Sequence, residues 1–229
     1  MFNKQKYIEL ITYSDIFGFH KDGIKLKSGR ISYYYANFRN ALENPEVFVR
    51  IINHIIDFIR ENNIEFDCIY GVPEGATPWG VAVSYELIKN KYILKRIAVG
   101  RGKVKEHGDP KNRYFVCAPE GKVLLIEDVT TTGSSLLEQV NKLREIENIE
   151  IIGAISLLNR CEIRDDGKTV KEILEENNIP FYSLADINDI LPIAVKILQP
   201  KEDTIRKVYN YYETYCKPKK LALEDLLIK

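Results

Sequence analysis

Acidic and hydroxyl side chains follow directly after an apolar run in the middle of the sequence. The stretch "VLLIEDVTTTGSS" covers residues 123–135, with Glu127 and Asp128 at the end of its apolar part. Free N–H groups at the start of a helix bind phosphate, and Gly133 lets the backbone close around the anion. Carboxylates accept hydrogen bonds from the vicinal hydroxyls of a sugar. The stretch therefore predicts a site for a phosphorylated sugar. An ordinary capped helix with two solvated acids is the alternative.

The two acids lie too close to a bound phosphate to be its ligands, so we assign them to the sugar hydroxyls. The hydroxyl side chains and the glycine are assigned to the phosphate. The candidate residues of this stretch are Glu127, Asp128, Thr130, Thr131, Thr132, Gly133, Ser134 and Ser135.

A polar segment ahead of this stretch carries a cluster of cations. The segment "GRGKVKEHGDPKNR" (100–113) has three glycines, one proline and no apolar periodicity. Its candidate residues are Arg101, Lys103, Lys105 and His107. Such a loop is either simply solvated or a mobile lid, and its position between two segments that can bind anions favours the lid.

The elements that must position these residues alternate along the chain. Apolar residues recur at helical spacing in 45–62, 79–90, 134–146 and 169–178, and strand-like segments lie at 66–72, 92–99, 122–129, 149–160 and 179–186. The alternation predicts an α/β fold with a central, mostly parallel sheet flanked by helices on both faces. Ligands bind beyond the carboxyl ends of such strands, which is where Glu127 and Asp128 fall.

The chain of 229 residues is expected to form one domain with additions. Residues 1–40 do not follow the alternation, and "GIKLKSGRISYYYANFR" predicts two strands that turn at Ser28 and Gly29. We expect these residues to form a small N-terminal hood with part of the C-terminal region. Residues 41–200 form the expected core, and residues 201–229 a C-terminal helical extension of unknown role.

The composition limits which binding partners and which cellular compartment we expect for the protein. Lys plus Arg and Asp plus Glu number 33 each, so no overall field attracts nucleic acid or an anionic membrane. The four cysteines are scattered without a CxxC pair, which argues against a zinc or disulfide framework. The N-terminus lacks an apolar signal core, and no apolar run reaches membrane-spanning length. We therefore expect a cytoplasmic protein that binds neither nucleic acid nor membrane.

The acid pair followed by Val-x-Thr-x-Gly-Ser resembles the phosphoribosyl diphosphate (PRPP) motif of type I phosphoribosyltransferases. Within that group the chain resembles the orotate phosphoribosyltransferase family, and no Walker loop or GxGxxG follows any strand. The resembling segments are "LKSGRISYYYAN" (26–37), "YGVPEGATP" (70–78), "RGKVKEHG" (101–108), "ISLLNR" (155–160) and "NIPFYSLADINDIL" (178–191).

This resemblance implies the type I phosphoribosyltransferase fold and a role for each segment. The loop 71–76 is then the pyrophosphate loop, and 101–108 is the mobile catalytic loop. PRPP contacts are expected from Val72, Pro73, Glu74, Gly75 and Arg101, in addition to the eight candidate residues named above between 127 and 135. Orotate contacts are expected from Lys27, Tyr34, Tyr35, Thr131 and Arg160. Lys103, Lys105, His107 and Asp128 are the expected catalytic residues.

The implied reaction transfers the 5-phosphoribosyl group of PRPP to orotate, with PRPP and orotate as the partners. The expected cofactor is Mg²⁺, held by the PRPP and not directly by protein side chains. In this family the lid reaches a neighbouring active site, so the resemblance implies a homodimer with lid residues shared between subunits. Two cations, Lys27 and Arg160, in one small site are expected to repel each other unless an anion such as orotate bridges them.

Three positions in the pyrophosphate loop and the catalytic loop depart from the family pattern. Gly102 stands where a second basic residue is usual, and Glu74 and Gly75 replace the common residues of the pyrophosphate loop. These departures leave two alternatives open: a type I phosphoribosyltransferase for another base, such as a purine or uracil, or a non-catalytic regulator with the same fold. Lys27 and Arg160 argue against a neutral base, and Lys105 and His107 argue against a pure sensor.

Overall fold

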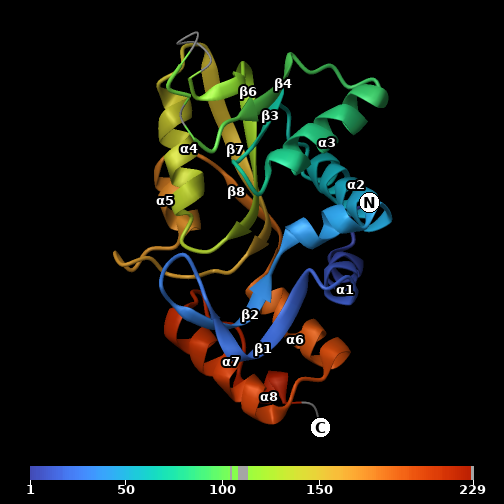
Figure 1. Cartoon of the computed structure of the whole chain (residues 1–229), viewed down its shortest axis with the longest axis vertical. Helices are drawn as coiled ribbons and strands as arrows, with labels where there is room; N and C mark the ends of the chain where they lie inside the picture. Colours follow the sequence, from blue (N-terminus) through green and yellow to red (C-terminus); the bar gives the residue numbers. More distant parts are fainter. Residues whose placement is uncertain (104, 108–112, 228–229) are drawn as a thin grey trace.

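A computed structural model describes residues 1–103, 105–107 and 113–227 of the chain. Its main sheet has six strands in the order β5-β4-β3-β6-β7-β8, and β5 is the antiparallel edge (Figure 1). The other neighbouring strands are parallel. The six strands are β3 (Cys68–Gly71), β4 (Arg96–Gly100), β5 (Phe115–Cys117), β6 (Gly121–Thr130), β7 (Ile149–Asn159) and β8 (Phe181–Asp186). The predicted mostly parallel sheet is confirmed.

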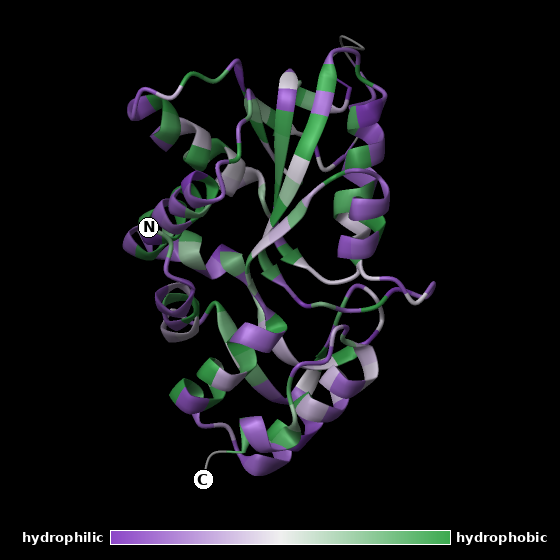
Figure 2. Ribbon diagram, turned by 180° about the vertical axis from the view of Figure 1, so that it is seen from behind, coloured by the Kyte–Doolittle hydropathy of each residue, from purple (hydrophilic) through white to green (hydrophobic). Residues whose placement is uncertain are grey.

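Helices cover both faces of this sheet, as predicted. In Figure 1, α4 (Ser134–Arg144) and α5 (Val170–Glu176) lie on one side. Across from them are α1 (Lys4–Tyr13), α2 (Pro45–Glu61) and α3 (Thr77–Lys89). The strands form an apolar layer between polar outer helix surfaces (Figure 2). This layering buries the apolar runs that the sequence places in the strands.

Local sequence fixes where two of these helices begin. The Asn44 side chain accepts hydrogen bonds from the N–H groups of Glu46 and Val47, and Pro45 follows it at the first helical position of α2. Thr169 and Glu172 form a reciprocal capping box at the start of α5. Because these caps satisfy N–H groups that have no partner within the helix, both helices begin close to the predicted residues.

The hood is a separate pair of antiparallel strands, β1 (Phe17–Lys25) and β2 (Ile31–Ala36). The turn between them contains Gly29, which has a φ of 85°. The other elements are the 3₁₀ helix η1 (Phe38–Glu43) and the helices α6 (Ile187–Leu198), α7 (Glu202–Tyr215) and α8 (Leu223–Leu226).

The two ends of the chain meet around the hood. Helices α6 and α7 contact β1, and α7 also contacts β2 (Figure 1). Helix α1, which the sequence pattern did not predict, packs against α6 and β8 instead of extending the hood strands. No helix among the described residues combines the length and apolar character needed to cross a bilayer.

The fold has one point where the chain reverses its direction of travel across the sheet. From β3 it proceeds to β4 and β5 at one edge, then returns to β6 on the other side of β3. Open parallel sheets bind ligands at such a point, beyond the carboxyl ends of the two strands. The segments that follow β3 and end β6 are the two that the sequence analysis assigned to anions.

Candidate active site

Two adjoining cavities lie at this reversal point. One measures about 650 Å³ and the other about 320 Å³. They share Lys27, Glu127, Thr131 and Ser135 among their lining residues. Strand β6 extends past its neighbour, because Gly71 at the end of β3 is paired with Ile126. The acids at 127 and 128 therefore stand beyond the end of β3, at the wall of the cavity.

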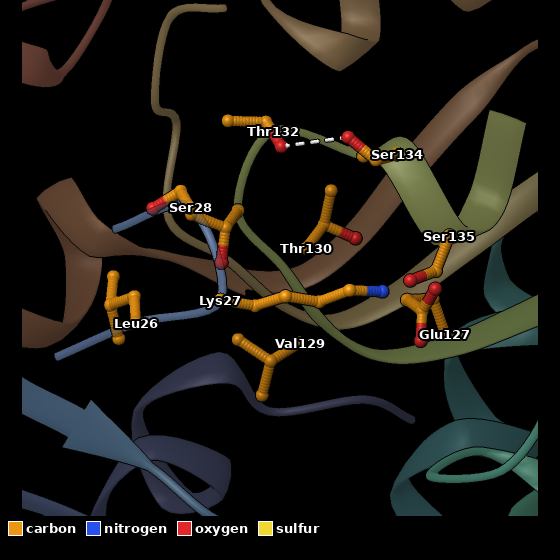
Figure 3. A pocket seen from close by; sticks show the side chains of 11 residues that line it. Leu26, Lys27, Ser28, Glu127, Val129, Thr130, Thr132, Ser134 and Ser135 are labelled. Atoms are coloured by element: carbon orange, nitrogen blue, oxygen red, sulfur yellow. Dashed lines mark hydrogen bonds between the residues drawn. The ribbon is translucent and has the colours of Figure 1, made fainter. Parts of the chain in front are cut away.

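The turn after β6 presents a row of backbone donors. Within the described part of the chain, the N–H groups of residues 131–135 donate to no protein acceptor. They surround the start of α4, where the helix dipole also favours an anion. The side chains of Thr132 and Ser134 lie beside each other, with their oxygens 3.1 Å apart (Figure 3). This arrangement fits a phosphate group.

Gly133 is required by the geometry of the turn. Its φ of 72° is a left-handed conformation that favours glycine. A Cβ atom at this position would lie 2.1 Å from Cγ2 of Val170. The turn can therefore pack against α5 only without a side chain at residue 133.

The acid pair combines one buried and one partly exposed carboxyl group. Burial, and then the neighbouring Asp128, raise the pKa of Glu127 well above its ordinary value, although Lys27 opposes the shift. Figure 3 shows the ammonium group of Lys27 directed toward Glu127 and Ser135. Asp128 accepts a hydrogen bond from the N–H of Val129 through Oδ1. A ligand with paired hydroxyls meets both acids at the same wall.

The loop after β3 supplies further free donors. Within the described residues, the N–H groups of Glu74 and Gly75 donate to no protein acceptor. Gly75 packs against the Asp128 carboxylate so closely that a Cβ would lie 2.5 Å from Oδ2. The glycine at this departure from the family pattern therefore leaves room for the acid.

The other two departures from the family pattern contact each other. A Cβ on Gly102 would lie 2.4 Å from Oε1 of Glu74, so the glutamate side chain occupies the space beside the glycine. Glu74 is exposed and also lines the larger cavity. The carboxylate thus extends toward the segment that contains the predicted lid cations.

The hood forms one wall of the larger cavity. Lys27 and Tyr35 line it, together with Asn37 and Arg39, which the sequence analysis did not single out. Their positions, two and four residues after the last tyrosine of the run 33–35, could have indicated them in the sequence. Tyr34 is a correction: its ring is fully buried, so it does not present a surface for a base. Because side chains alternate along β2, only Tyr35 of the two faces this cavity.

Arg160 lines the cavity but is not a free cation. Its Nε donates to Oε1 of Glu162 at 2.7 Å, and its guanidinium lies 4.2 Å from the centre of the Tyr34 ring. Only 1% of the residue surface is exposed. The expectation that an anionic ligand alone must relieve repulsion between Lys27 and Arg160 is therefore wrong, because Glu162 already pairs with Arg160.

Two further predicted contacts need correction. Thr130 lines the smaller cavity, but its hydroxyl is buried and already donates to the Ser156 Oγ at 2.8 Å. The Val72 side chain is fully buried, and its N–H donates to the Ile126 carbonyl. Neither residue has a free side-chain donor for PRPP, and the Val72 N–H is also taken.

The described cations of the basic loop do not line the cavities. Lys103, Lys105 and His107 are exposed, and none of them lines either cavity. Arg101 donates to the carbonyl of Phe115 through Nε at 3.2 Å. Residues 104 and 108–112, which belong to the predicted lid, lie outside the described residues. The role of these cations in a mobile lid therefore stays a prediction.

Comparisons with known proteins agree with these features. Residues 39–186 match the family described as "Phosphoribosyl transferase domain". The orotate phosphoribosyltransferase of Pyrococcus abyssi is 31% identical over 169 residues, which cover 74% of this chain and 86% of the relative. That of Methanosphaera stadtmanae is 32% identical over 186 residues, covering 81% and 95%. A crystal structure of orotate phosphoribosyltransferase from Francisella tularensis superposes with a TM-score of 0.69 at 27% identity, covering 92% of this chain and 96% of that one.

Proposed function

The chain belongs to the orotate phosphoribosyltransferase family of phosphoribosyltransferases, and from this premise we propose how its cavity performs the transfer. N1 of orotate displaces pyrophosphate from C1 of PRPP and gives orotidine 5′-phosphate, a step of pyrimidine synthesis. One observation carries the assignment of the site: free N–H groups of two loops and a pair of acids line two adjoining cavities at the reversal point of the sheet.

Each part of PRPP is bound by a different set of protein groups. The N–H groups of residues 131–135 bind the 5′-phosphate, and those of Glu74 and Gly75 bind the pyrophosphate. Glu127 and Asp128 accept hydrogen bonds from the ribose hydroxyls. These contacts hold C1 of the ribose toward the hood, where the base binds.

The base binds between the hood and the strand ends. The exposed ammonium group of Lys27 pairs with the orotate carboxylate, and Tyr35 borders the ring. Arg160, whose Nε is paired with Glu162, donates a hydrogen bond to the base. A neutral base such as uracil would offer the Lys27 ammonium no carboxylate.

Charge develops at two places during the transfer. The leaving pyrophosphate becomes more anionic, and Lys103, Lys105 and His107 would stabilise it after the loop closes. The ribose ring gains positive character, which Asp128 favours through its negative charge. Closure would also exclude water, which otherwise competes with orotate as the nucleophile.

Mg²⁺ is the proposed cofactor. The ion prefers oxygen ligands and keeps several waters, so it suits a site where PRPP oxygens supply most ligands and the acid pair lies nearby. Among the described residues no group of three or more His, Cys, Asp or Glu side chains could hold a metal ion by itself. When bound through PRPP, the ion would supply positive charge to the pyrophosphate. Calorimetric titration of Mg²⁺ with and without PRPP tests this; tight binding without PRPP would contradict it.

We further propose a homodimer in which the lid of one subunit serves the other. The support is the family resemblance, together with exposed apolar side chains on α3, β5 and the segment between α3 and β4: Tyr85, Ile93 and Val116 are 63%, 90% and 57% exposed. Exposed apolar groups of this kind mark interaction sites. Light scattering during size exclusion should give twice the chain mass, and a monomer at micromolar concentration would refute the dimer.

The cytoplasm is the proposed location. All four cysteines are free and none is paired, which fits a reducing compartment. Cell fractionation followed by immunodetection tests this, and recovery in a secreted or membrane fraction would contradict it.

The transfer is tested by incubating the protein with PRPP, Mg²⁺ and each of orotate, uracil, hypoxanthine and guanine. We expect pyrophosphate release with orotate at an efficiency at least about a thousandfold above that with uracil, because a site built for a charged group rejects the analogue without it. Efficient use of another base would overturn the orotate assignment. Absence of turnover with every base would favour a regulator that only binds PRPP.

A further inference from the structure

Arg160 belongs to a buried cluster that joins three parts of the chain. Its guanidinium touches β2 through the Ser32 Oγ at 2.8 Å and the Tyr34 carbonyl at 3.3 Å. It also contacts the Tyr211 hydroxyl of helix α7 at 3.4 Å and Glu162, two residues along the chain. A flexible side chain is thereby held from several directions.

Glu162 is the centre of this cluster. Its side chain has no exposed surface. Oε1 accepts hydrogen bonds from the Arg160 Nε and the Tyr211 hydroxyl at 2.7 and 2.9 Å, and Oε2 accepts from the Arg30 Nη1 at 2.8 Å. Burial and the nearby Glu162 raise the pKa of Tyr211, so its hydroxyl remains a donor.

The cluster carries one positive charge in excess, because Arg30 and Arg160 share the single carboxylate of Glu162. An excess charge in a buried group favours an anionic partner nearby. The larger cavity, which Arg160 lines, is where such a partner can bind.

Arg160 has one donor left for that partner. Nε, both N–H groups of Nη2 and one N–H of Nη1 have acceptors or hydroxyl partners, while the second N–H of Nη1 has none among the described residues. The guanidinium group is planar and rigid. Fixing its other four N–H groups therefore also fixes the direction of the remaining one.

We propose that Glu162 and Tyr211 are positioning residues that hold Arg160 with its remaining N–H available to the base, so that helix α7 takes part in base recognition. This inference rests on the proposed transfer to orotate. It gives the C-terminal helical extension, whose role the sequence left open, a direct link to the site. PRPP binds to the other loops, so the effect concerns the base.

Steady-state kinetics of the Tyr211→Phe variant test the proposal. The change removes one hydroxyl and keeps the ring. Loss of the hydrogen bonds should raise the KM for orotate on the order of fivefold while the KM for PRPP stays within about twofold of the parent. Tyr215→Phe is the matched control: this tyrosine lies on the same helix, its ring contacts that of Tyr211, and its hydroxyl has no hydrogen bond among the described residues. It should leave both KM values unchanged.

A second variant separates positioning from simple stabilisation. In an Arg160→Lys background, Tyr211→Phe should have little further effect on the KM for orotate, since the tyrosine acts through the guanidinium. A Tyr211→Phe protein with a lower melting temperature but an unchanged KM for orotate would overturn the positioning role alone. A parent protein that does not use orotate would overturn the proposed function and this inference together, so the two failures can be told apart.

Discussion

At the scale of single residues, the site places two carboxyl groups in different environments. Glu127 is only 7% exposed, whereas Asp128 is partly exposed and hydrogen-bonded to the backbone. Glu127 is enclosed, whereas Asp128 remains accessible from the larger cavity. Asp128 is therefore the more accessible acceptor for the expected ribose hydroxyls.

Asp128→Asn should weaken PRPP binding without changing the fold. The amide keeps the shape of the side chain, but charge-assisted hydrogen bonds to the ribose are lost, at a cost of about 1.5–3 kcal/mol. Isothermal titration with PRPP and Mg²⁺ measures the change. Parent-like affinity in this variant would show that Asp128 does not hold the ribose.

Glu127→Gln should change how stability depends on pH. The pKa of Glu127 is raised in the folded protein, so the folded state keeps a proton that the unfolded state loses above pH 4.5. The parent should therefore lose stability, by at most about 1.4 kcal/mol per pH unit, as pH rises from 4.5 to the raised pKa. The glutamine variant lacks this loss.

Denaturant unfolding of parent and variant at pH 5, 6, 7 and 8 checks this prediction. The stability difference should grow in favour of Glu127→Gln with rising pH until the raised pKa is passed. A constant difference across the series would mean that the carboxyl group titrates normally in the folded protein.

At the scale of elements, the turn of residues 131–135 depends on how α4 and α5 pack. Gly133→Ala should destabilise the protein and raise the KM for PRPP, because it combines left-handed strain of about 1–2 kcal/mol with a clash against Val170. Gly167→Ala is the control, since Gly167 has a φ of 77° but no atom within 4 Å of an added Cβ. Urea unfolding that gives equal losses for both variants would rule out the packing contribution.

The basic loop is a second element with a testable role. Lys105→Ala and His107→Ala should lower kcat more than they raise the KM for orotate, because these cations act on charge that grows during the reaction. Lys21→Ala removes an exposed cation of β1 and should change neither value. An increased KM with parent kcat would instead assign the loop to ground-state binding.

At the scale of the whole molecule, the C-terminal helices fasten the hood to the core. The Tyr212 hydroxyl donates to Oδ1 of Asn188 in α6 and accepts hydrogen bonds from the N–H groups of Lys220 and Leu221. One side chain thereby joins α6, α7 and the segment leading to α8. These helices lie together at the bottom of Figure 1. The chain end is integrated into the fold through this contact.

Tyr212→Phe should cost about 1–3 kcal/mol, since it leaves buried polar groups without their partner. Tyr13→Phe, at a tyrosine that is 74% exposed, should stay within about 0.5 kcal/mol of the parent. Thermal unfolding followed by circular dichroism compares the three proteins. Equal stability of both variants and the parent would show that the hydroxyl does not fasten the C-terminal segment.

The sequence by itself determined the elements and motifs whose signal is local. Apolar periodicity located α2, α3, α4 and α5, and buried runs located the parallel strands of the sheet. The order of helices and strands determined the α/β fold, and the acid pair with its glycine-containing turn predicted a phosphate site. Such features are set by residues close together in the chain, so their spacing reveals them.

The tertiary structure decided which side chains remain free to bind a ligand. Arg160 and Glu162 are close in sequence, but their burial with Arg30 and Tyr211 depends on contacts across up to 132 residues. The same holds for Tyr34, which packs into the core, and for the contact between Glu74 and Gly102. Whether a charge is paired depends on distance and burial in three dimensions, and residue type alone does not contain either quantity.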